Sequence, residues 1–271
     1  MTSVPRNLRT RVHADRETPM LTVAVLQQKG GSGKTTLAIN LAAAAHLDGR
    51  RTLVVDMDRQ ASAFDWSAAR EDGSPLDGLA VVKADRAIAL PRFKEIARGY
   101  DYVFLDGPPR LGDVTQSAAV AADVALLPIQ PGPFDFWAVA ETLESLDQAD
   151  QVREQLGRTP IRRVFVVNRA GAGTRLAREA EQELRKSGGE LAGVVHQRVA
   201  FPDAASRGES VLTSPAAYAA ADDIQRLWRA LKGGKHGPQP QEAKPRTKRE
   251  ASEGGRGEAR RGRKAHRRRR A

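Results

Sequence analysis

The chain of 271 residues contains no cysteine. Disulfide bridges, thiolate zinc sites and iron–sulfur clusters are excluded together, because each of them needs cysteine sulfur. Apolar runs of the roughly 20 residues that a helix needs to cross a bilayer are also missing. The first residues lack the apolar core of a secretory signal. We therefore expect a protein that does not span a membrane and that stays in the cytoplasm.

Histidine and tryptophan are sparse, and their positions favour structural roles. The five histidines are too scattered for a metal site: they are His13, His46, His196, His236 and His266. Trp66, Trp137 and Trp228 could be stacking platforms for bases, but the first and the last fall within helical patterns, where burial is commoner. We therefore assign no metal and no base to these side chains.

Positive charge is concentrated at one end of the sequence. The last 40 residues, from Lys232 onward, contain 15 Lys and Arg against 4 Asp and Glu, which equals the net charge of +11 of the whole chain. Ala is the only apolar residue in this segment, so it cannot bury enough surface to offset the entropy of ordering. We predict that residues 232–271 form a disordered polybasic tail. Such a tail binds nucleic-acid phosphates without reading base sequence; the alternative is a solvated segment that only aids solubility.

The other end of the sequence is a polar arm. Residues 1–19 contain four arginines and two prolines with little periodicity, and we expect them to be disordered. Met20 stands directly before the first apolar run, so translation could start there rather than at Met1. The alternative function for the arm is a basic segment that touches DNA.

Between the arm and the tail, short apolar runs alternate with helical patterns. This alternation predicts an α/β fold with a single doubly wound, mostly parallel sheet flanked by helices. The predicted strands are 21–27, 52–56, 79–83, 101–106, 123–129, 161–167 and 191–197. The predicted helices are 34–48, 60–70, 88–98, 113–121, 135–157, 174–187 and 215–231. Open sheets of this kind bind ligands at the carboxyl ends of their strands, so the polar residues there are the candidate site.

A glycine-rich loop follows the first predicted strand and precedes the first predicted helix. It is the run Lys29-Gly30-Gly31-Ser32-Gly33-Lys34-Thr35-Thr36. Glycines let backbone N–H groups turn toward an anion, and the helix N-terminus adds its positive end, so the loop is a phosphate cradle. Lys34 is placed to neutralise β- and γ-phosphates, and the Thr35 hydroxyl to ligate Mg²⁺. The loop has Gln28 where the usual pattern has Gly, and it carries a second lysine, Lys29.

With this second lysine the loop resembles the deviant Walker A loop of the ParA/MinD family of ATPases. Leu53–Asp58 is similar to the second acidic motif of that family, and Tyr102–Pro109, which ends in Asp-Gly-Pro-Pro, is similar to its Walker B strand. The three motifs come in the family's order, each at a predicted strand end. The resemblance covers about residues 21–231, is strongest to the short, ParF-like plasmid type, and implies a P-loop ATPase domain over residues 20–231. The alternative is a glycine turn and two strands that happen to end in Asp.

The resemblance implies roles for the residues at the strand ends. Backbone contacts to phosphates would come from Gly30, Gly31, Ser32, Gly33 and Thr36. Asp106 would hold Mg²⁺ and Asp58 would orient the attacking water, with Asp56 as its neighbour toward the metal; the alternative for Asp56 and Asp58 is strand-end capping. Asn168 resembles the residue that contacts the adenine edge, although an Asn in a loop is more often a turn former. The segment 128–135 resembles one that lies near the base and the dimer seam.

The extra lysine implies an oligomer. In the family this lysine contacts the nucleotide of a partner subunit, so Lys29 predicts an ATP-dependent homodimer with slow basal ATP hydrolysis. Arg59 stands where most relatives have Pro, and its effect on turnover is left open. Arg198, Arg207, Arg226 and Arg229 fall where relatives carry non-specific DNA contacts.

The leading interpretation is a partition ATPase. The ATP-bound dimer would coat nucleoid DNA without sequence preference, and a ParB-like or small adaptor protein on the cargo would stimulate hydrolysis. One alternative is a relative that positions a protein cargo, such as a chemoreceptor cluster or a microcompartment. A more distant alternative is a small-molecule ATP-dependent ligase on the same fold. A membrane-bound MinD-type protein is disfavoured because the tail has nothing apolar to insert. The lack of cysteine excludes the nitrogenase iron protein.

Overall fold

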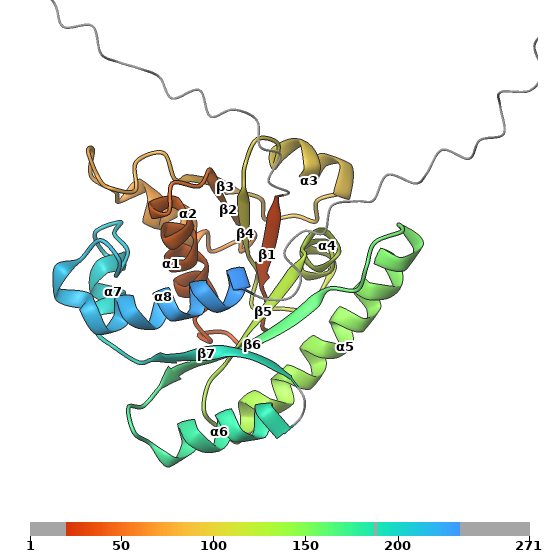
Figure 1. Cartoon of the computed structure of the whole chain (residues 1–271). Coiled ribbons are helices and arrows are strands. Elements are labelled where there is room, and N and C mark those ends of the chain that lie inside the picture. The colour runs from red at the N-terminus through yellow and green to blue at the C-terminus, as the bar shows by residue number, and fades with distance from the viewer. Residues whose placement is uncertain (1–19, 187–188, 234–271) are drawn as a thin grey trace, which may run out of the picture. The chain divides into compact units, whose positions relative to one another are not determined.

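The computed structural model describes residues 20–186 and 189–233. The predicted arm, residues 1–19, and all but the first two residues of the predicted tail lie outside these ranges. Within them the chain forms a seven-stranded sheet flanked by helices, which confirms the predicted fold class (Figure 1).

All strand pairs in the sheet are parallel, in the order β3-β2-β4-β1-β5-β6-β7. The strands are β1 (Leu21–Val25), β2 (Thr52–Asp56), β3 (Ala80–Lys83), β4 (Tyr102–Asp106), β5 (Val124–Ile129), β6 (Arg162–Ala170) and β7 (Glu190–His196). All seven predicted strands are present. The largest difference is at β6, which continues past the predicted end at 167, through a register shift between Val167 and Ala170.

The helices agree with the predicted ranges with one exception. They are α1 (Lys34–Leu47), α2 (Ser62–Ala68), α3 (Leu90–Ile96), α4 (Asp113–Ala121), α5 (Pro133–Gln155), α6 (Arg175–Lys186), α7 (Ala200–Ala205) and α8 (Tyr218–Gly233), with a 3-10 turn at Pro215–Ala217. The short helix α7 was not predicted, because its six residues include Pro202 and are too few to show a helical period. Of the helices described, none is both long and apolar enough to cross a membrane.

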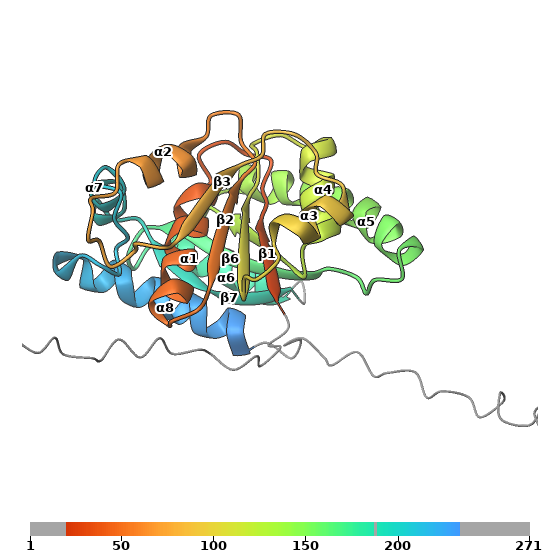
Figure 2. The ribbon, with the colours of Figure 1, turned by 90° about the horizontal axis from the view of Figure 1, so that it is seen from above.

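The sheet is buried on both faces, as its apolar strands require. Alternate residues of β1 point to opposite faces: Val23 and Val25 pack with α1, α2, α7 and α8, whereas Ala24 packs with α3, α4, α5 and α6. Figure 2 shows α1 and α8 on one side of the strands and α3 and α4 on the other. The two helical layers make the sheet doubly wound.

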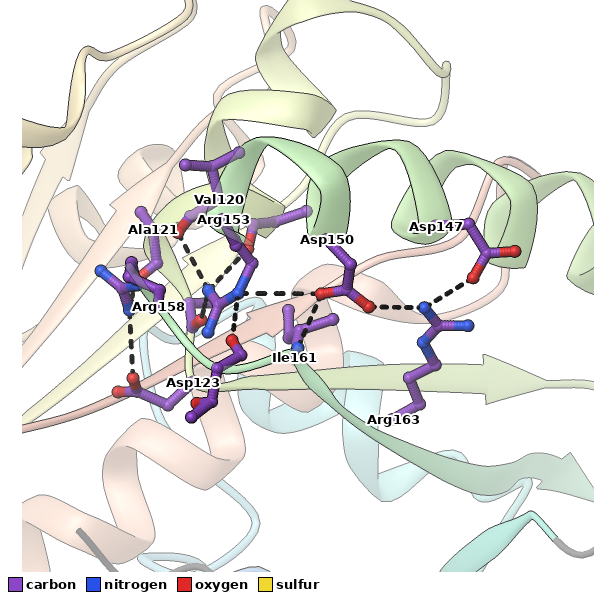
Figure 3. Close-up of polar contacts among 12 residues, drawn as sticks. Val120, Ala121, Asp123, Asp147, Asp150, Arg153, Arg158, Ile161 and Arg163 are labelled. Carbon is purple, nitrogen blue, oxygen red and sulfur yellow. Dashed lines mark hydrogen bonds and ion pairs between the residues drawn. The ribbon is translucent and has the colours of Figure 1, made fainter. Parts of the chain in front are cut away.

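A buried arginine joins α4 to α5 (Figure 3). The side chain of Arg153, in α5, is 2% exposed. Its Nε donates to the Thr159 carbonyl at 2.9 Å, and its Nη1 donates to the carbonyls of Val120 at 2.9 Å and Ala122. These last carbonyls lie at the C-terminal end of α4, where helix carbonyls lack partners within the helix. Asp150 lies 3.7 Å from Arg153 Nε and supplies the opposite charge.

The strand order places one loop at the switch point of the sheet. β1 lies between β4 and β5. After β1 the chain continues into α1 on one face of the sheet, and after β4 it continues into α4 on the other face. Asp106, the last residue of β4, pairs in register with Val25 of β1 and with Asp56 of β2. The predicted acidic residues and the glycine-rich loop therefore meet at one carboxyl edge, where open parallel sheets bind ligands.

Candidate phosphate-binding site

The glycine-rich loop turns sharply into α1 through Gly33. Gly33 has φ 92°, in the left-handed region that favours glycine, and α1 begins at the next residue. A Cβ at this position would lie 2.2 Å from Asn168 Nδ2, so a side chain would also collide with β6. The loop therefore needs glycine here both for its backbone angle and for its close approach to the neighbouring strand end.

Side chains at the carboxyl ends of β5 and β6 donate hydrogen bonds to carbonyls of the loop. The Gly31 carbonyl accepts hydrogen bonds from Gln130 Nε2 at 2.7 Å and from Arg169 Nη1 at 2.9 Å. The Ser32 carbonyl accepts one from Asn168 Nδ2 at 2.7 Å. Asn168 is buried against the loop, and its predicted contact with the adenine edge stays a prediction. Gln130 and Arg169 were not assigned from sequence; their one signal is a polar side chain at a strand end beside the switch point.

Lys34 is a buried cation at the start of α1. Its side chain is 6% exposed, and its Nζ donates to the Lys29 carbonyl at 3.4 Å. Burial lowers the pKa of Lys34, and the nearby carboxylates of Asp106 and Asp58 act in the opposite direction. The ammonium group thus lies within electrostatic range of both predicted acidic residues, as a phosphate-neutralising lysine would.

Asp106 is a buried carboxylate without a hydrogen-bond partner among the described residues. Both of its oxygens are inaccessible to solvent, and neither accepts a hydrogen bond of good geometry. Burial raises the pKa of Asp106 to about 7, against the opposing effect of the Thr35 hydroxyl. An unpaired buried carboxylate is unfavourable, and a divalent cation with oxygen ligands would satisfy it. Asp106 and Thr35 therefore fit the predicted magnesium ligands.

The residues described contain no group of three acidic or histidine side chains that could hold a metal alone. This suits magnesium, which usually keeps several waters and is bound through one or two carboxylates plus substrate phosphates. The assignment of Thr35 and Asp106 as magnesium ligands stays a prediction.

Asp56, at the end of β2, has hydrogen-bond partners on both oxygens. Its Oδ1 accepts from the Asp58 amide at 3.1 Å, and its Oδ2 accepts from the amides of Ala63 at 2.8 Å and Phe64 at 3.0 Å. These bonds satisfy amides at the start of α2 that the helix leaves free. Burial raises the pKa of Asp56, and the same backbone bonds oppose the rise. Asp56 therefore fixes the segment that carries Asp58, while its role toward the metal stays a prediction.

Asp58 lies in a tight turn with Arg59 at its apex. The Asp58 carbonyl accepts a hydrogen bond from the Ala61 amide at 3.0 Å, which closes a four-residue turn, and Asp58 Oδ1 accepts one from the Gln60 amide at 3.1 Å. Arg59 occupies the second position of this turn, which Pro favours. No described residue accepts a hydrogen bond from the Arg59 amide. The proline that most relatives have at this position lacks an N–H, and it would therefore lose no hydrogen bond in this turn.

A cavity of about 510 Å³ extends the site along α1. Its lining includes Thr35 and Thr36 from α1, Trp66 from α2 and Pro202 from α7. Asn40 also lines the cavity, and its Oδ1 accepts hydrogen bonds from Ser210 Oγ at 2.7 Å and from the Val211 amide at 3.0 Å. This cavity could not be predicted from the sequence, because one of its walls is the unpredicted helix α7.

The tryptophans with described side chains have structural roles, as expected. Trp66 is 4% exposed and Trp228 is 3% exposed. The Trp66 indole donates to the Glu209 carbonyl at 2.9 Å, and the Trp228 indole donates to Asp48 Oδ2 at 2.7 Å. The side chain of Trp137 lies outside the described part of the chain.

Three of the arginines predicted to contact DNA are paired within the fold. Arg198 Nε lies 3.4 Å from Asp223, Arg207 Nη2 lies 3.1 Å from Glu209, and Arg226 pairs with Asp222. Such pairs on the surface are weak and can be exchanged, but each carboxylate lowers the positive potential around its arginine. The fourth, Arg229, is exposed and donates to a helix carbonyl, Gln225 O, at 3.2 Å.

Known proteins share both the sequence pattern and the fold. Residues 23–211 match the profile described as the CobQ/CobB/MinD/ParA nucleotide binding domain. The chain is 32% identical to the chromosome-partitioning ATPase Soj of Thermus thermophilus, over 73% of this chain and 91% of that protein. It is 28% identical to the maintenance of carboxysome distribution protein A of Halothiobacillus neapolitanus, over 76% of this chain and 94% of that protein.

Solved structures with low sequence identity have the same fold. An ATP complex of a Cyanothece McdA variant matches with a TM-score of 0.65 at 17% identity, over 78% of this chain and 96% of that one. Cobyrinic acid a,c-diamide synthase from Mycobacterium smegmatis, with a bound ATP analog and magnesium, matches with a TM-score of 0.60 at 22% identity, over 80% of this chain and 97% of that one. At these identities the likeness establishes the fold alone.

Proposed function

Since the chain belongs to the ParA/MinD family of nucleotide-binding ATPases, we propose that it is a partition ATPase that segregates or positions a plasmid or a chromosome. It would bind ATP and magnesium at the loop after β1 and hydrolyse ATP slowly to ADP and phosphate. The observation that carries the proposal is the buried, unpaired carboxylate of Asp106 beside Thr35 and the buried ammonium group of Lys34. This set of groups suits a triphosphate with its metal.

The residues around the loop divide the chemistry of hydrolysis. Lys34 would exchange its contact with the Lys29 carbonyl for the β- and γ-phosphates, and partial desolvation strengthens that charge interaction. Thr35 and Asp106 would hold magnesium, Asp106 through a water. Bound magnesium would neutralise charge on the phosphate oxygens. Asp58, fixed by the turn after β2, would orient the attacking water.

Lys29 is the residue that we propose to act between two copies of the chain. It would contact the nucleotide of the partner subunit, so that ATP holds the homodimer together and hydrolysis releases it. The proposal rests on the lysine that precedes the two glycines of the loop, which the usual P-loop pattern lacks.

Non-specific DNA binding is proposed chiefly for the basic segment after α8. It carries a net charge of +10, whereas three arginines of the folded region pair with carboxylates. Binding through phosphates alone would be independent of base sequence and would weaken steeply with salt. A ParB-like or small adaptor protein on the cargo would stimulate hydrolysis and release the dimer from the nucleoid.

A protein cargo is the second candidate. The carboxysome distribution protein of Halothiobacillus neapolitanus matches this chain over 94% of that protein's own length, and an McdA structure has the same fold. The same ATPase cycle would then space a protein assembly, such as a microcompartment or a chemoreceptor cluster, over the nucleoid. A gene for a small DNA-binding adaptor beside that of this chain would favour partition, and a chemotaxis or microcompartment operon would favour the protein cargo.

A small-molecule ligase on the same fold is the more distant candidate. The fold of a cobyrinic acid a,c-diamide synthase matches that of this chain, but the likeness concerns the fold alone. Such an enzyme would need neither a second lysine in the loop nor a polybasic segment.

DNA co-sedimentation with ATP, with ADP and without nucleotide tests the DNA part of the proposal. We expect the full chain to bind DNA most tightly with ATP, and a chain truncated after Gly233, the last residue of α8, to bind much more weakly at the same salt. Equal binding in all three nucleotide states would contradict an ATP-driven switch. Unchanged binding by the truncated chain would contradict the assignment to the basic segment.

Light scattering of the full chain tests the dimer. ATP should produce dimers, and Lys29→Ala should prevent them while leaving the monomer folded. Lys94→Ala is the matched control, because Lys94 is an exposed lysine on α3, away from the loop. ATP-dependent dimers of Lys29→Ala would contradict the role of Lys29 between two copies.

A further inference from the structure

Two side chains to which the sequence motifs assign no role, those of Gln130 and Arg169, donate hydrogen bonds to the Gly31 carbonyl of the glycine-rich loop. We propose that Gln130 and Arg169 are positioning residues that aim the Ser32 amide into the phosphate cradle and thereby set the affinity for the β-phosphate of the nucleotide. The inference rests on the proposed function only in requiring that the loop binds phosphate.

The argument begins with the geometry of the peptide unit. In a planar trans peptide the C=O of one residue and the N–H of the next point in opposite directions. Gln130 and Arg169 both bind the Gly31 carbonyl, at 2.7 and 2.9 Å, so the Ser32 N–H points to the other side of the loop. Asn168 binds the Ser32 carbonyl at 2.7 Å and fixes the Gly33 N–H in the same way.

The groups on the inner side of the loop have no partners among the residues that the structure describes. No described residue accepts a hydrogen bond from the amides of Ser32 or Gly33. The Ser32 hydroxyl is also buried, without a partner among the same residues. Buried polar groups are normally paired. In this loop the carbonyls of Gly31 and Ser32 accept hydrogen bonds, whereas the amides of Ser32 and Gly33, which point the opposite way, have no acceptor among the described residues. Several aligned N–H donors form the concavity that binds anions.

The backbone at Arg169 supports a positioning role. Arg169 has φ 54°, in the left-handed region that a long side chain seldom adopts, and β6 is irregular between Val167 and Ala170. Irregularities of this kind re-aim side chains beside active sites. Here the strained residue belongs to β6, two strands away from β1, and its guanidinium group reaches the Gly31 carbonyl. Backbone strain persists where surrounding contacts hold it, and this hydrogen bond is one such contact.

The two donors differ in charge but share a carbonyl. Gln130 is neutral and Arg169 is cationic, and a carbonyl oxygen has lone pairs for both. If the role is to orient the peptide, removal of either donor should weaken binding of the β-phosphate. If the role were to attract the nucleotide by charge, only Arg169 should matter.

Calorimetric titration of the full chain with ADP and with AMP tests the inference. We expect Arg169→Ala to weaken ADP binding about tenfold, which corresponds to about 1.4 kcal/mol, and Gln130→Ala to weaken it several-fold. AMP affinity should stay within about twofold in both, because AMP has no β-phosphate. Arg175→Ala is the matched control: Arg175 is an exposed arginine of α6 whose Nε lies 3.2 Å from Glu179. It should leave both affinities unchanged.

Two further substitutions separate orientation from charge. Arg169→Gln keeps a donor without the charge, and we expect it to bind ADP more tightly than Arg169→Met, which keeps neither. Three results together would overturn the inference in favour of a charge contact. Arg169→Lys would bind ADP as tightly as the wild type, Arg169→Gln would bind it as weakly as Arg169→Met, and Gln130→Ala would have no effect. Equal losses for ADP and AMP would overturn it in favour of a general structural role. Failure of the wild-type chain to bind ADP would instead refute the proposed function.

Discussion

Two buried charged groups of this chain have opposite surroundings. Arg153 belongs to α5, and its guanidinium group donates to carbonyls at the end of α4 and to the Thr159 carbonyl after α5, and faces Asp150 (Figure 3). Asp106 lies at the carboxyl edge of the sheet, and its two buried oxygens accept no hydrogen bond of good geometry from any residue that the structure describes, with only the Thr35 hydroxyl acting on them as a donor. Burial acts against the charge in both, since it lowers the pKa of Arg153 and raises that of Asp106 to about 7.

The difference separates stability from function. A buried charge with a full set of partners holds elements together, and its loss leaves those partners unsatisfied. A buried charge without partners lowers the stability of the folded chain and persists where a ligand completes its surroundings. Substitutions at the two positions should therefore have opposite consequences for stability and for ATP hydrolysis.

The largest expected effect is on hydrolysis in Asp106→Asn. Loss of the carboxylate removes a proposed magnesium ligand, and we expect the rate of ATP hydrolysis to fall about 100-fold or more, the size of effect seen when one electrostatic group of a site is lost. Stability without nucleotide should stay the same or rise, because an unpaired buried charge is gone. A phosphate-release assay and a urea melt measure the two quantities. Asp72→Asn, the same change at an exposed loop position, should alter neither.

The next effect is on stability in Arg153→Met. A methionine fills similar space but leaves carbonyls at the end of α4 without donors, so we expect a loss of about 3 kcal/mol in the free energy of unfolding. ADP affinity of the remaining folded chain should be unchanged. The control is Arg185→Met, since Arg185 is 62% exposed and pairs with Glu181 on the same helix; exposed pairs contribute less than about 1 kcal/mol. A small loss in Arg153→Met would remove the contrast between the two buried charges.

A third expected effect is on the pH dependence of stability without nucleotide and metal. The pKa of Asp106 is about 7 in the folded chain, above its ordinary value of about 4 in the unfolded chain. Between these values the folded chain binds more protons, so this group makes stability fall as the pH rises from about 4 to about 7. The difference in unfolding free energy between wild type and Asp106→Asn, measured by urea melts in a chelator, should grow across this range. A constant difference would show that the carboxylate has partners in solution.

The smallest expected effect is at the turn beside Asp58. Arg59→Pro places the favoured residue at the second position of a turn whose hydrogen bonds do not use the Arg59 amide. We expect a gain of less than about 1 kcal/mol in the free energy of unfolding, through the entropy of the unfolded chain. ADP affinity should stay within about twofold. A loss of stability would show that the turn adopts an angle that proline cannot take.

The sequence was sufficient for the elements of the sheet and for the residues at its carboxyl edge. β1, β2 and β5 are buried along their whole length, so they appear as short apolar runs that periodicity and length identify. Lys34 and Thr35 follow from the spacing of the glycine-rich loop, and Asp106 follows from its place at the end of an apolar run. The geometry brings them together as the parallel order predicts.

The contacts between distant segments were beyond the reach of the sequence. Arg169 binds Gly31 although 138 positions separate them, and only the order of β1, β5 and β6 brings them together. Arg153 lies in a helix, where an arginine is usually exposed, so nothing in the sequence marked it as buried. The hydrogen bonds of Asp56 likewise depend on where α2 begins, two residues later than predicted.

The attachment of α4 through Arg153 has a consequence for motion. The segment that follows Asp106 leads through Gly107 and two prolines into the N-terminal end of α4, whereas the C-terminal end is tied to α5. A displacement of this segment during the ATPase cycle cannot slide the helix along its axis without breaking the bonds to Arg153. Gln116, nearer the N-terminal end of α4, also donates to the Ser145 carbonyl of α5 at 2.9 Å, so a shift at the carboxyl edge would have to carry the two helices together.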